Sequence, residues 1–108
     1  MHPKIHISKE AKDKKERLFV GGKLKIVVDK IHEYLLFYSG NRVAVVCTNN
    51  DKVEMISVCL DRDISTHITF DSLLLKPDTI KISGDYRSKT VKIAYEDADG
   101  KMQTLSLS

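Results

Sequence analysis

The 108-residue sequence has no tryptophan, only two prolines, two cysteines and one glutamine, and no long apolar run. A membrane-spanning helix needs roughly 20 consecutive apolar residues, and no stretch approaches that length. The first residues also lack the 7–15-residue apolar stretch that is typical of a signal peptide. We therefore expect a cytoplasmic protein that does not contact a membrane.

The two cysteines, Cys47 and Cys59, are too few for a disulfide framework. They fall on two predicted strands joined by a turn at residues 48–51. In a simple hairpin Cys59 would lie five residues along from the position that faces Cys47, which is roughly 16 Å and far beyond disulfide reach. The spacing predicts two free, inert core thiols in a reducing compartment.

The charge is distributed unevenly along the chain. The formal net charge is +3, but residues 1–30 hold nine Lys/Arg and four Asp/Glu, a net of +5, whereas residues 31–108 have a net of −2. A basic segment on a near-neutral body can attract phosphate backbones or acidic partners. It can also serve only solubility, because Glu10, Asp13 and Glu16 dilute it.

Residues 23–38 fit two different elements. On a helical wheel their apolar side chains fall within an arc of about 120°, and Gly40 follows as a stop signal. The members of this arc are Leu24, Val27, Val28, Ile31, Tyr34, Leu35 and Tyr38. The rival interpretation is two strands at 24–29 and 34–38, which the β-branched run at residues 26–28 favours. We prefer the helix because it uses the polar residues 29–33 on its other side.

The remaining pattern is that of β-structure. Residues 43–48 are nearly all apolar and β-branched, as in a central strand that is covered on both faces. Residues 53–60, 68–70, 79–83, 91–95 and 105–107 are further strand candidates, and Asp99-Gly100 is a hairpin signal. Asp71 can cap one helical turn at about 71–76, which Pro77 prevents from extending.

These elements predict one α+β domain at residues 17–108, preceded by a basic arm at residues 1–16. Its sheet is mostly antiparallel with 5–7 strands, its main helix covers about 23–38, and its short helical turn covers about 71–76. The alternative is an all-β meander. Residues 8–17, with almost no apolar side chain, are expected to form a solvated helix or a loose arm.

No catalytic motif is present, so we expect a protein that is not an enzyme and that binds no metal or cofactor. The best acidic cluster is Asp61 and Asp63 with His67, but a solvated loop between strands explains it better. Gly21-Gly22 lies between a strand and the expected helix, where a helix N-terminus can bind an anion. Two glycines are also what a tight turn needs.

The predicted order of elements resembles one half of a DNA sliding clamp of the proliferating-cell-nuclear-antigen type. In this likeness residues 17–31 match the first strand and helix, residues 42–48 and 53–60 a hairpin, residues 68–76 a strand and second helix, and residues 79–107 a three-strand meander. The resemblance implies DNA-facing lysines at Lys23, Lys25, Lys30 and Lys76. A clamp subunit has two or three such halves, whereas this chain has one, and the linker beside which clamps bind partner peptides has no counterpart.

We therefore expect a non-enzymatic accessory protein that associates with DNA or with a DNA-processing assembly. A clamp-like ring would need a homo-oligomer of six copies, and the other possibility is that the protein forms no ring. Basic residues of the first third, Lys12, Lys14 and Lys15, join the four lysines above as expected nucleic-acid contacts. Tyr86 and Arg87, at the tip of a predicted hairpin, are the expected contacts to a protein partner. The alternative is a protein–protein adaptor or small subunit without nucleic-acid contact.

Overall fold

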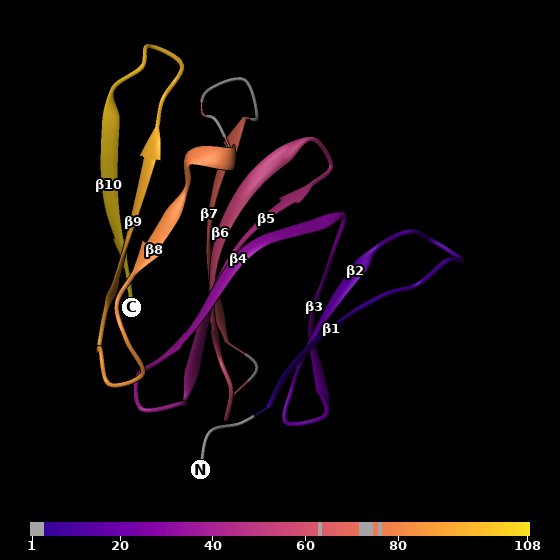
Figure 1. The fold of residues 1–108 in the computed structure, drawn as a ribbon. Helices are drawn as coiled ribbons and strands as arrows, with labels where there is room; N and C mark the ends of the chain where they lie inside the picture. The colour runs from indigo at the N-terminus through magenta and orange to yellow at the C-terminus, as the bar shows by residue number, and fades with distance from the viewer. Residues whose placement is uncertain (1–3, 63, 72–74, 76) are drawn as a thin grey trace.

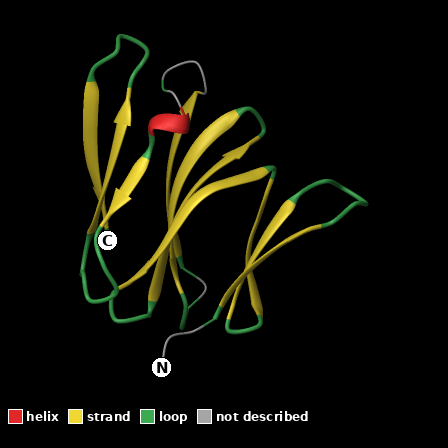
Figure 2. Cartoon of the chain, in the orientation of Figure 1, coloured by secondary structure: helices red, strands yellow, loops and turns green. Residues whose placement is uncertain are grey.

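The computed structural model describes residues 4–62, 64–71, 75 and 77–108, which form ten strands in three antiparallel sheets (Figure 1). The strands are β1 (Ile5–Lys9), β2 (Glu16–Val20), β3 (Lys23–Val28), β4 (Lys30–Phe37), β5 (Arg42–Asn49), β6 (Lys52–Cys59), β7 (Ser65–Asp71), β8 (Lys81–Ser83), β9 (Val91–Glu96) and β10 (Met102–Leu107). Within these residues there is no α-helix, and one 3-10 turn, Pro77–Thr79, precedes β8 (Figure 2). The protein is therefore all-β in the described part.

Each sheet is a meander of consecutive strands. The N-terminal sheet has the order β1-β2-β3, the middle sheet β4-β5-β6-β7, and the C-terminal sheet β10-β9-β8. Two-residue turns with positive φ at both positions close two of the hairpins, at Gly21-Gly22 and at Asn50-Asp51. Such turns match the right-handed twist of paired strands, so the glycines and the Asn-Asp pair fix the hairpin register. The predicted turns at residues 48–51 and 99–100 are confirmed.

The middle sheet separates two hydrophobic cores, and the outer sheets lie on either side of it (Figure 1). On β5, Ala44 and Val46 face the core shared with the C-terminal sheet, whereas Val43, Val45 and Cys47 face the core shared with the N-terminal sheet. All five side chains are fully buried. The prediction that residues 43–48 form a central strand covered on both faces is confirmed.

The expected helix at 23–38 is wrong, because these residues form β3 and β4 and the all-β alternative holds. Four members of the expected apolar arc, Leu24, Val27, Tyr34 and Tyr38, are between 38% and 49% exposed, which a buried helix face would not allow. The polar interruption that favoured the helix is instead the corner at Asp29, where the chain leaves the N-terminal sheet for the middle sheet. The clamp-like order of elements therefore loses its first helix.

Carboxylates hold this corner in place. The backbone N–H of Asn50 donates to Asp29 Oδ2 at 2.9 Å, and the N–H of Ile31 donates to Glu16 Oε1 at 2.7 Å. Each bond ties the corner to a neighbouring hairpin. The polar side chain of Asp29 thus serves the crossing between two layers, which local periodicity does not reveal.

Two other local expectations change. Residues 8–17, expected as a solvated helix or loose arm, belong to β1, β2 and the loop between them, and β1 pairs with β2 from Ile5↔Val20 to Lys9↔Glu16. The expected helical turn at 71–76 lies largely outside the described residues. Of its described members, Asp71 ends β7 and Leu75 forms an isolated bridge to Asp97.

The cysteines lie where the hairpin register predicts. Cys47 is opposite Glu54 and Cys59 is opposite Arg42, so the two are five positions apart along β6 and both are free. Burial, and secondarily the charge of Glu54, raises the pKa of the Cys47 thiol to about 12. A thiol held in its protonated form is a poor nucleophile at neutral pH.

Candidate functional site

The basic residues predicted to contact nucleic acid do not form one surface. Lys12, Lys14 and Lys15 lie in the loop between β1 and β2, whereas Lys23 lies at the opposite end of β2, directly after the Gly21-Gly22 turn. Lys30 begins β4 beyond the corner, and Lys76 lies outside the described residues. The set therefore divides between two ends of the N-terminal sheet.

The outer face of the N-terminal sheet brings together side chains that the sequence analysis did not select. Alternation along β1 and β2 turns Ile5, Ile7, Leu18 and Val20 toward the core. His6 and Phe19 are paired across the strands on the opposite face, with ring centroids 6.1 Å apart and planes inclined by 41°. This pair forms an aromatic patch on the outer surface of the molecule.

Apolar and basic side chains surround this ring pair. Leu24, which is 49% exposed, lies opposite Phe19 on β3, and Val27 lies opposite Arg17. A hollow of 380 Å³ is lined by Lys4, His6, Ser8, Phe19 and Gly22. We name this surface, formed by Lys4, His6, Ser8, Arg17, Phe19, Leu24 and Val27, the outer face.

Arg17 is fixed by an ion pair with the loop that joins β1 to β2. Its Nη2 lies 2.6 Å from Asp13 Oδ2 and its Nη1 3.2 Å from Asp13 Oδ1, and the N–H of Lys15 donates to the same carboxylate at 3.0 Å. The hydrogen bond from Arg17, followed by that from the Lys15 backbone, lowers the pKa of Asp13 to about 2. The loop is therefore ordered around Asp13 and leaves Lys12 and Lys14 exposed at its tip.

The N-terminal sheet carries the positive charge of the whole molecule. Residues 4–28 contain eight Lys/Arg and three Asp/Glu, a net of +5, and the rest of the chain has a net of −2. Lys4, at the start of this sheet, and Lys9 of β1 were missed because residues 1–16 were expected to be an arm, and Arg17 of β2 was also not selected. The signal for them was the alternation of Ile5 and Ile7 with His6 and Ser8, which predicts a half-buried strand.

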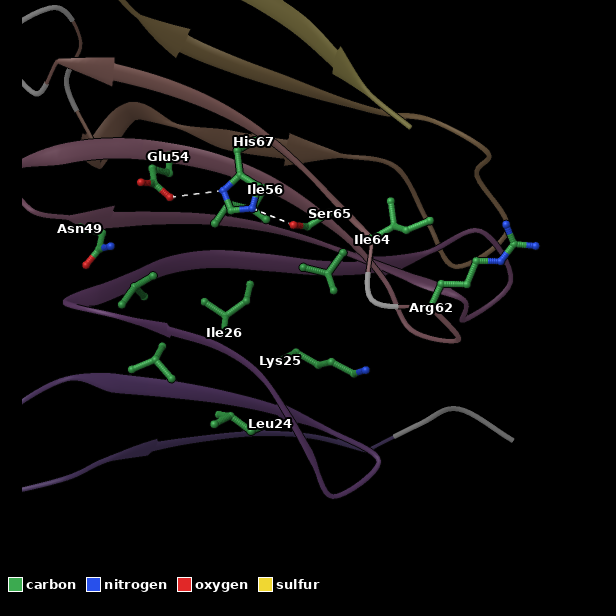
Figure 3. A pocket seen from close by; sticks show the side chains of 13 residues that line it. Leu24, Lys25, Ile26, Asn49, Glu54, Ile56, Arg62, Ile64, Ser65 and His67 are labelled. Carbon is green, nitrogen blue, oxygen red and sulfur yellow. Dashed lines mark hydrogen bonds and ion pairs between the residues drawn. The ribbon is translucent and has the colours of Figure 1, made fainter.

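A second site is a cleft of 360 Å³ beside β3, between that strand and the face of β6 and β7 (Figure 3). A β-bulge creates one of its walls. Leu18 pairs with Ile26 and Phe19 pairs with Leu24, so Lys25 is the extra residue on β3. Bulges re-aim side chains, and Lys25 lies in the cleft with its Nζ 3.4 Å from the carbonyl oxygen of Leu60. Lys25 is thereby separated from the other predicted DNA contacts.

Ser65, His67 and Glu54 form a polar row on the floor of the cleft (Figure 3). Ser65 Oγ and His67 Nε2 are 2.8 Å apart, but His67 Nδ1 is 3.6 Å from Glu54 Oε2, which exceeds hydrogen-bond distance. The side chain of His67 is also 47% exposed. The order of groups resembles a hydrolase proton relay, but neither the second distance nor the exposure supports one.

The expected acidic cluster is not assembled in the described part of the chain. The Cys59 thiol donates to Asp61 Oδ1 at 2.9 Å, and this hydrogen bond is the largest cause that lowers the pKa of Asp61. His67 instead faces the cleft, and Asp63 is not described. Among the residues that the structure describes, no three His, Cys, Asp or Glu side chains are grouped so that they could hold a metal ion.

The expected partner contacts Tyr86 and Arg87 lie in the loop between β8 and β9. Tyr86 packs so closely over Gly40 that a Cβ at that glycine would overlap its hydroxyl, and the N–H of Ser39 donates to the Tyr86 carbonyl at 2.7 Å. Tyr86 thus joins this loop to the turn between β4 and β5. Arg87 is exposed.

Comparison of the chain with protein-family models, with curated proteins and with solved structures finds no match. The fold and the two sites therefore stand on the geometry above. None of the helical segments in the described residues is long and apolar enough to cross a membrane.

Proposed function

We propose that the protein is a nucleic-acid-binding module that uses the outer face of its N-terminal sheet, with single-stranded DNA or RNA as the ligand. The observation that carries this proposal is the ring pair His6–Phe19 on the most basic sheet of the molecule. Proteins that bind single strands combine aromatic side chains, on which bases stack, with basic residues that follow the phosphates. The outer face has both.

The arrangement assigns different roles to its side chains. Phe19 and His6 offer ring surfaces for two neighbouring bases, and Leu24 and Val27 extend the apolar surface along β3. Lys4 and Arg17 border the rings, and Lys12 and Lys14 lie at the tip of the adjoining loop, where they would contact phosphates. Stacking of this kind tolerates any base, so binding without sequence preference is expected.

The shape of the face favours a single strand over a duplex. The basic helix edges that the clamp resemblance required are not part of the described structure, and β3 and β4 occupy that segment. Paired bases present their edges, not their faces, and a three-stranded sheet with a ring pair on its outer face complements unpaired bases.

Fluorescence anisotropy with labelled oligonucleotides of about 20 nucleotides tests the proposal, with a duplex of the same length as comparison. Binding to the single strand should be strongest at low salt, and log K should fall linearly with log salt at about −0.7 per phosphate contacted. The variant Phe19→Leu, which keeps an apolar side chain, should weaken binding about fivefold or more, because stacking contributes ~1–3 kcal/mol per base.

Paired charge variants locate the surface. The double variant Lys4→Ala/Arg17→Ala should weaken binding. It should also make the slope of log K against log salt less steep, by the amount that about two phosphate contacts contribute. The matched control Lys92→Ala/Lys101→Ala removes two exposed lysines from the C-terminal sheet region and should leave binding unchanged. Equal effects of the two double variants, or the absence of binding at low salt, would contradict the proposal.

A further inference from the structure

The cleft beside β3 lies where a fourth strand of the N-terminal sheet would pair with β3. The middle sheet has four strands and the N-terminal sheet has three. Ser65 and His67 of β7 pair with Val58 and Ile56 of β6, so the two pairs share the face that is turned toward the N-terminal sheet. Ile56 and Val58 are buried, whereas Ser65 and His67 are exposed. The N-terminal sheet therefore stops short of β7.

The wall of the cleft is a strand edge. In the described structure β3 pairs with β2 on one side, and its other side borders the cleft (Figure 3). An edge strand offers a row of backbone N–H and C=O groups to any extended chain that lies beside it. A segment placed there would become the fourth strand of the N-terminal sheet and would cover the open part of β6 and β7.

The two ends of the cleft differ in charge. Lys25 and Arg62 lie toward one end, whereas Glu54 and Asn49 lie toward the other (Figure 3). Asn49 Oδ1 is buried and has no hydrogen-bond partner among the described residues. Ile64, which is 57% exposed, adds an apolar surface near the basic end. The cleft thus provides cations at one end, apolar surface between, and the Glu54 carboxylate at the other.

We propose that this cleft binds an extended peptide segment of a partner protein by strand addition to β3, with a carboxylate of that segment between Lys25 and Arg62. Main-chain hydrogen bonds to β3 supply affinity, and alternate side chains of the segment reach the floor that β6 and β7 form. This site shares Leu24 and Val27 of β3 with the outer face, but its cations and its floor are separate, and it does not depend on nucleic-acid binding.

Charge selects a peptide over a second copy of the chain. Pairing of β3 with β3 of another copy would place two N-terminal sheets, each with a net charge of +5, side by side. Like charges across a strand pair are destabilising. The positive charge of the N-terminal sheet instead attracts an acidic segment.

Titration with defined peptides tests the inference. The probes are fluorescein-labelled octapeptides of alternating valine and threonine that end in aspartate with a free carboxyl terminus, and the same peptides ending in lysine amide. The acidic peptide should bind and should shift the amide NMR signals of residues 25–28 together with the ring signals of His67. The lysine peptide should bind at least about tenfold more weakly, because hydrogen bonds to charged groups are the stronger ones.

Variants of exposed residues keep the fold intact during this test. Arg62→Ala should weaken the acidic peptide about tenfold and Ile64→Ser several-fold. The matched controls are Lys92→Ala and Met102→Ser, which change exposed residues of β9 and β10. Absence of binding by both peptides, signals that shift at His6 and Phe19 instead of at residues 25–28 and His67, or equal effects of variants and controls would overturn the inference. A dimer in sedimentation equilibrium that Arg62→Ala dissociates would assign the cleft to a second copy and would overturn it as well.

Discussion

Single carboxylate side chains in this protein stabilise the places where one chain segment connects to the next. Asp29 and Glu16 bind the backbone at the corner between two sheets, and Asp13 organises the loop between β1 and β2. Each carboxylate accepts backbone N–H groups that a turn or corner would otherwise leave without a partner. Charged residues that a sequence pattern assigns to solvent therefore also fix the connections.

Asp13 should make the loop between β1 and β2 sensitive to acid. Its pKa is about 2 in the folded chain against an ordinary 3.8. A lowered pKa means that its contribution is fully present above pH 3.8 and is lost as the pH falls through about 2. In an NMR titration the carboxyl carbon of Asp13 should change with a midpoint near 2, and the amide of Lys15 should lose its hydrogen-exchange protection over the same range.

The variant Arg17→Lys provides the control for this titration. A lysine cannot reproduce the two parallel hydrogen bonds of the guanidinium. The midpoint of Asp13 should therefore move back toward 3.8 in the variant. A midpoint near 3.8 in the unaltered protein would show that the ion pair does not persist in solution.

At the scale of elements, turn chemistry and strand alternation carry most of the predictable information. The turn at 48–51, the hairpin at 99–100 and the doubly covered strand β5 follow from residue types alone. The segment 23–38 was misread because β3 places its buried apolar residues on one core whereas β4 divides its own between both cores. Two such strands around a one-residue corner imitate helical spacing. Local periodicity cannot record which layer a strand belongs to.

The candidate sites were predictable in part. Charge counts located the basic third of the chain, but not that it forms one sheet with Lys4 and Arg17 beside a ring pair. The position of Lys25 depends on a bulge, and the cleft depends on three strands opposite four. The bulge and the cleft both depend on how the strands pack in the folded molecule, so no sequence motif predicts them.

Strand β5 should be equally sensitive on its two faces. Val45 and Val46 are adjacent, fully buried, and turned toward different cores. Removal of two methyl groups at either position should lower the free energy of unfolding by about 2 kcal/mol, from lost burial and the cavity that remains. Urea unfolding of Val45→Ala and Val46→Ala measures this, with Val27→Ala, 38% exposed on β3, as a near-neutral control. A neutral result at one of the two core valines would mean that one face of β5 is open to solvent.

At the scale of the whole molecule, the sheet that joins the two cores and the sheet that carries the net positive charge are different ones. The middle sheet contributes side chains to both cores, whereas the N-terminal sheet carries the net positive charge. The outer face and the cleft both belong to this basic sheet, one on its surface and the other at its edge. A ligand on the outer face and a peptide beside β3 would therefore contact the same three strands from two directions.

The three sheets should unfold together, because neither outer sheet has a core of its own. Leu18 of β2 and Ile93 of β9 are fully buried in different cores, and each core is completed by strands of the middle sheet. Leu18→Ala and Ile93→Ala should each lower stability by about 2–5 kcal/mol. In both variants NMR signals from all three sheets should disappear at one common urea concentration, with an unchanged slope m. If signals of β1, β2 and β3 disappear first in Leu18→Ala, while those of β8, β9 and β10 persist, the N-terminal sheet is a separate cooperative unit and the middle sheet does not couple the layers.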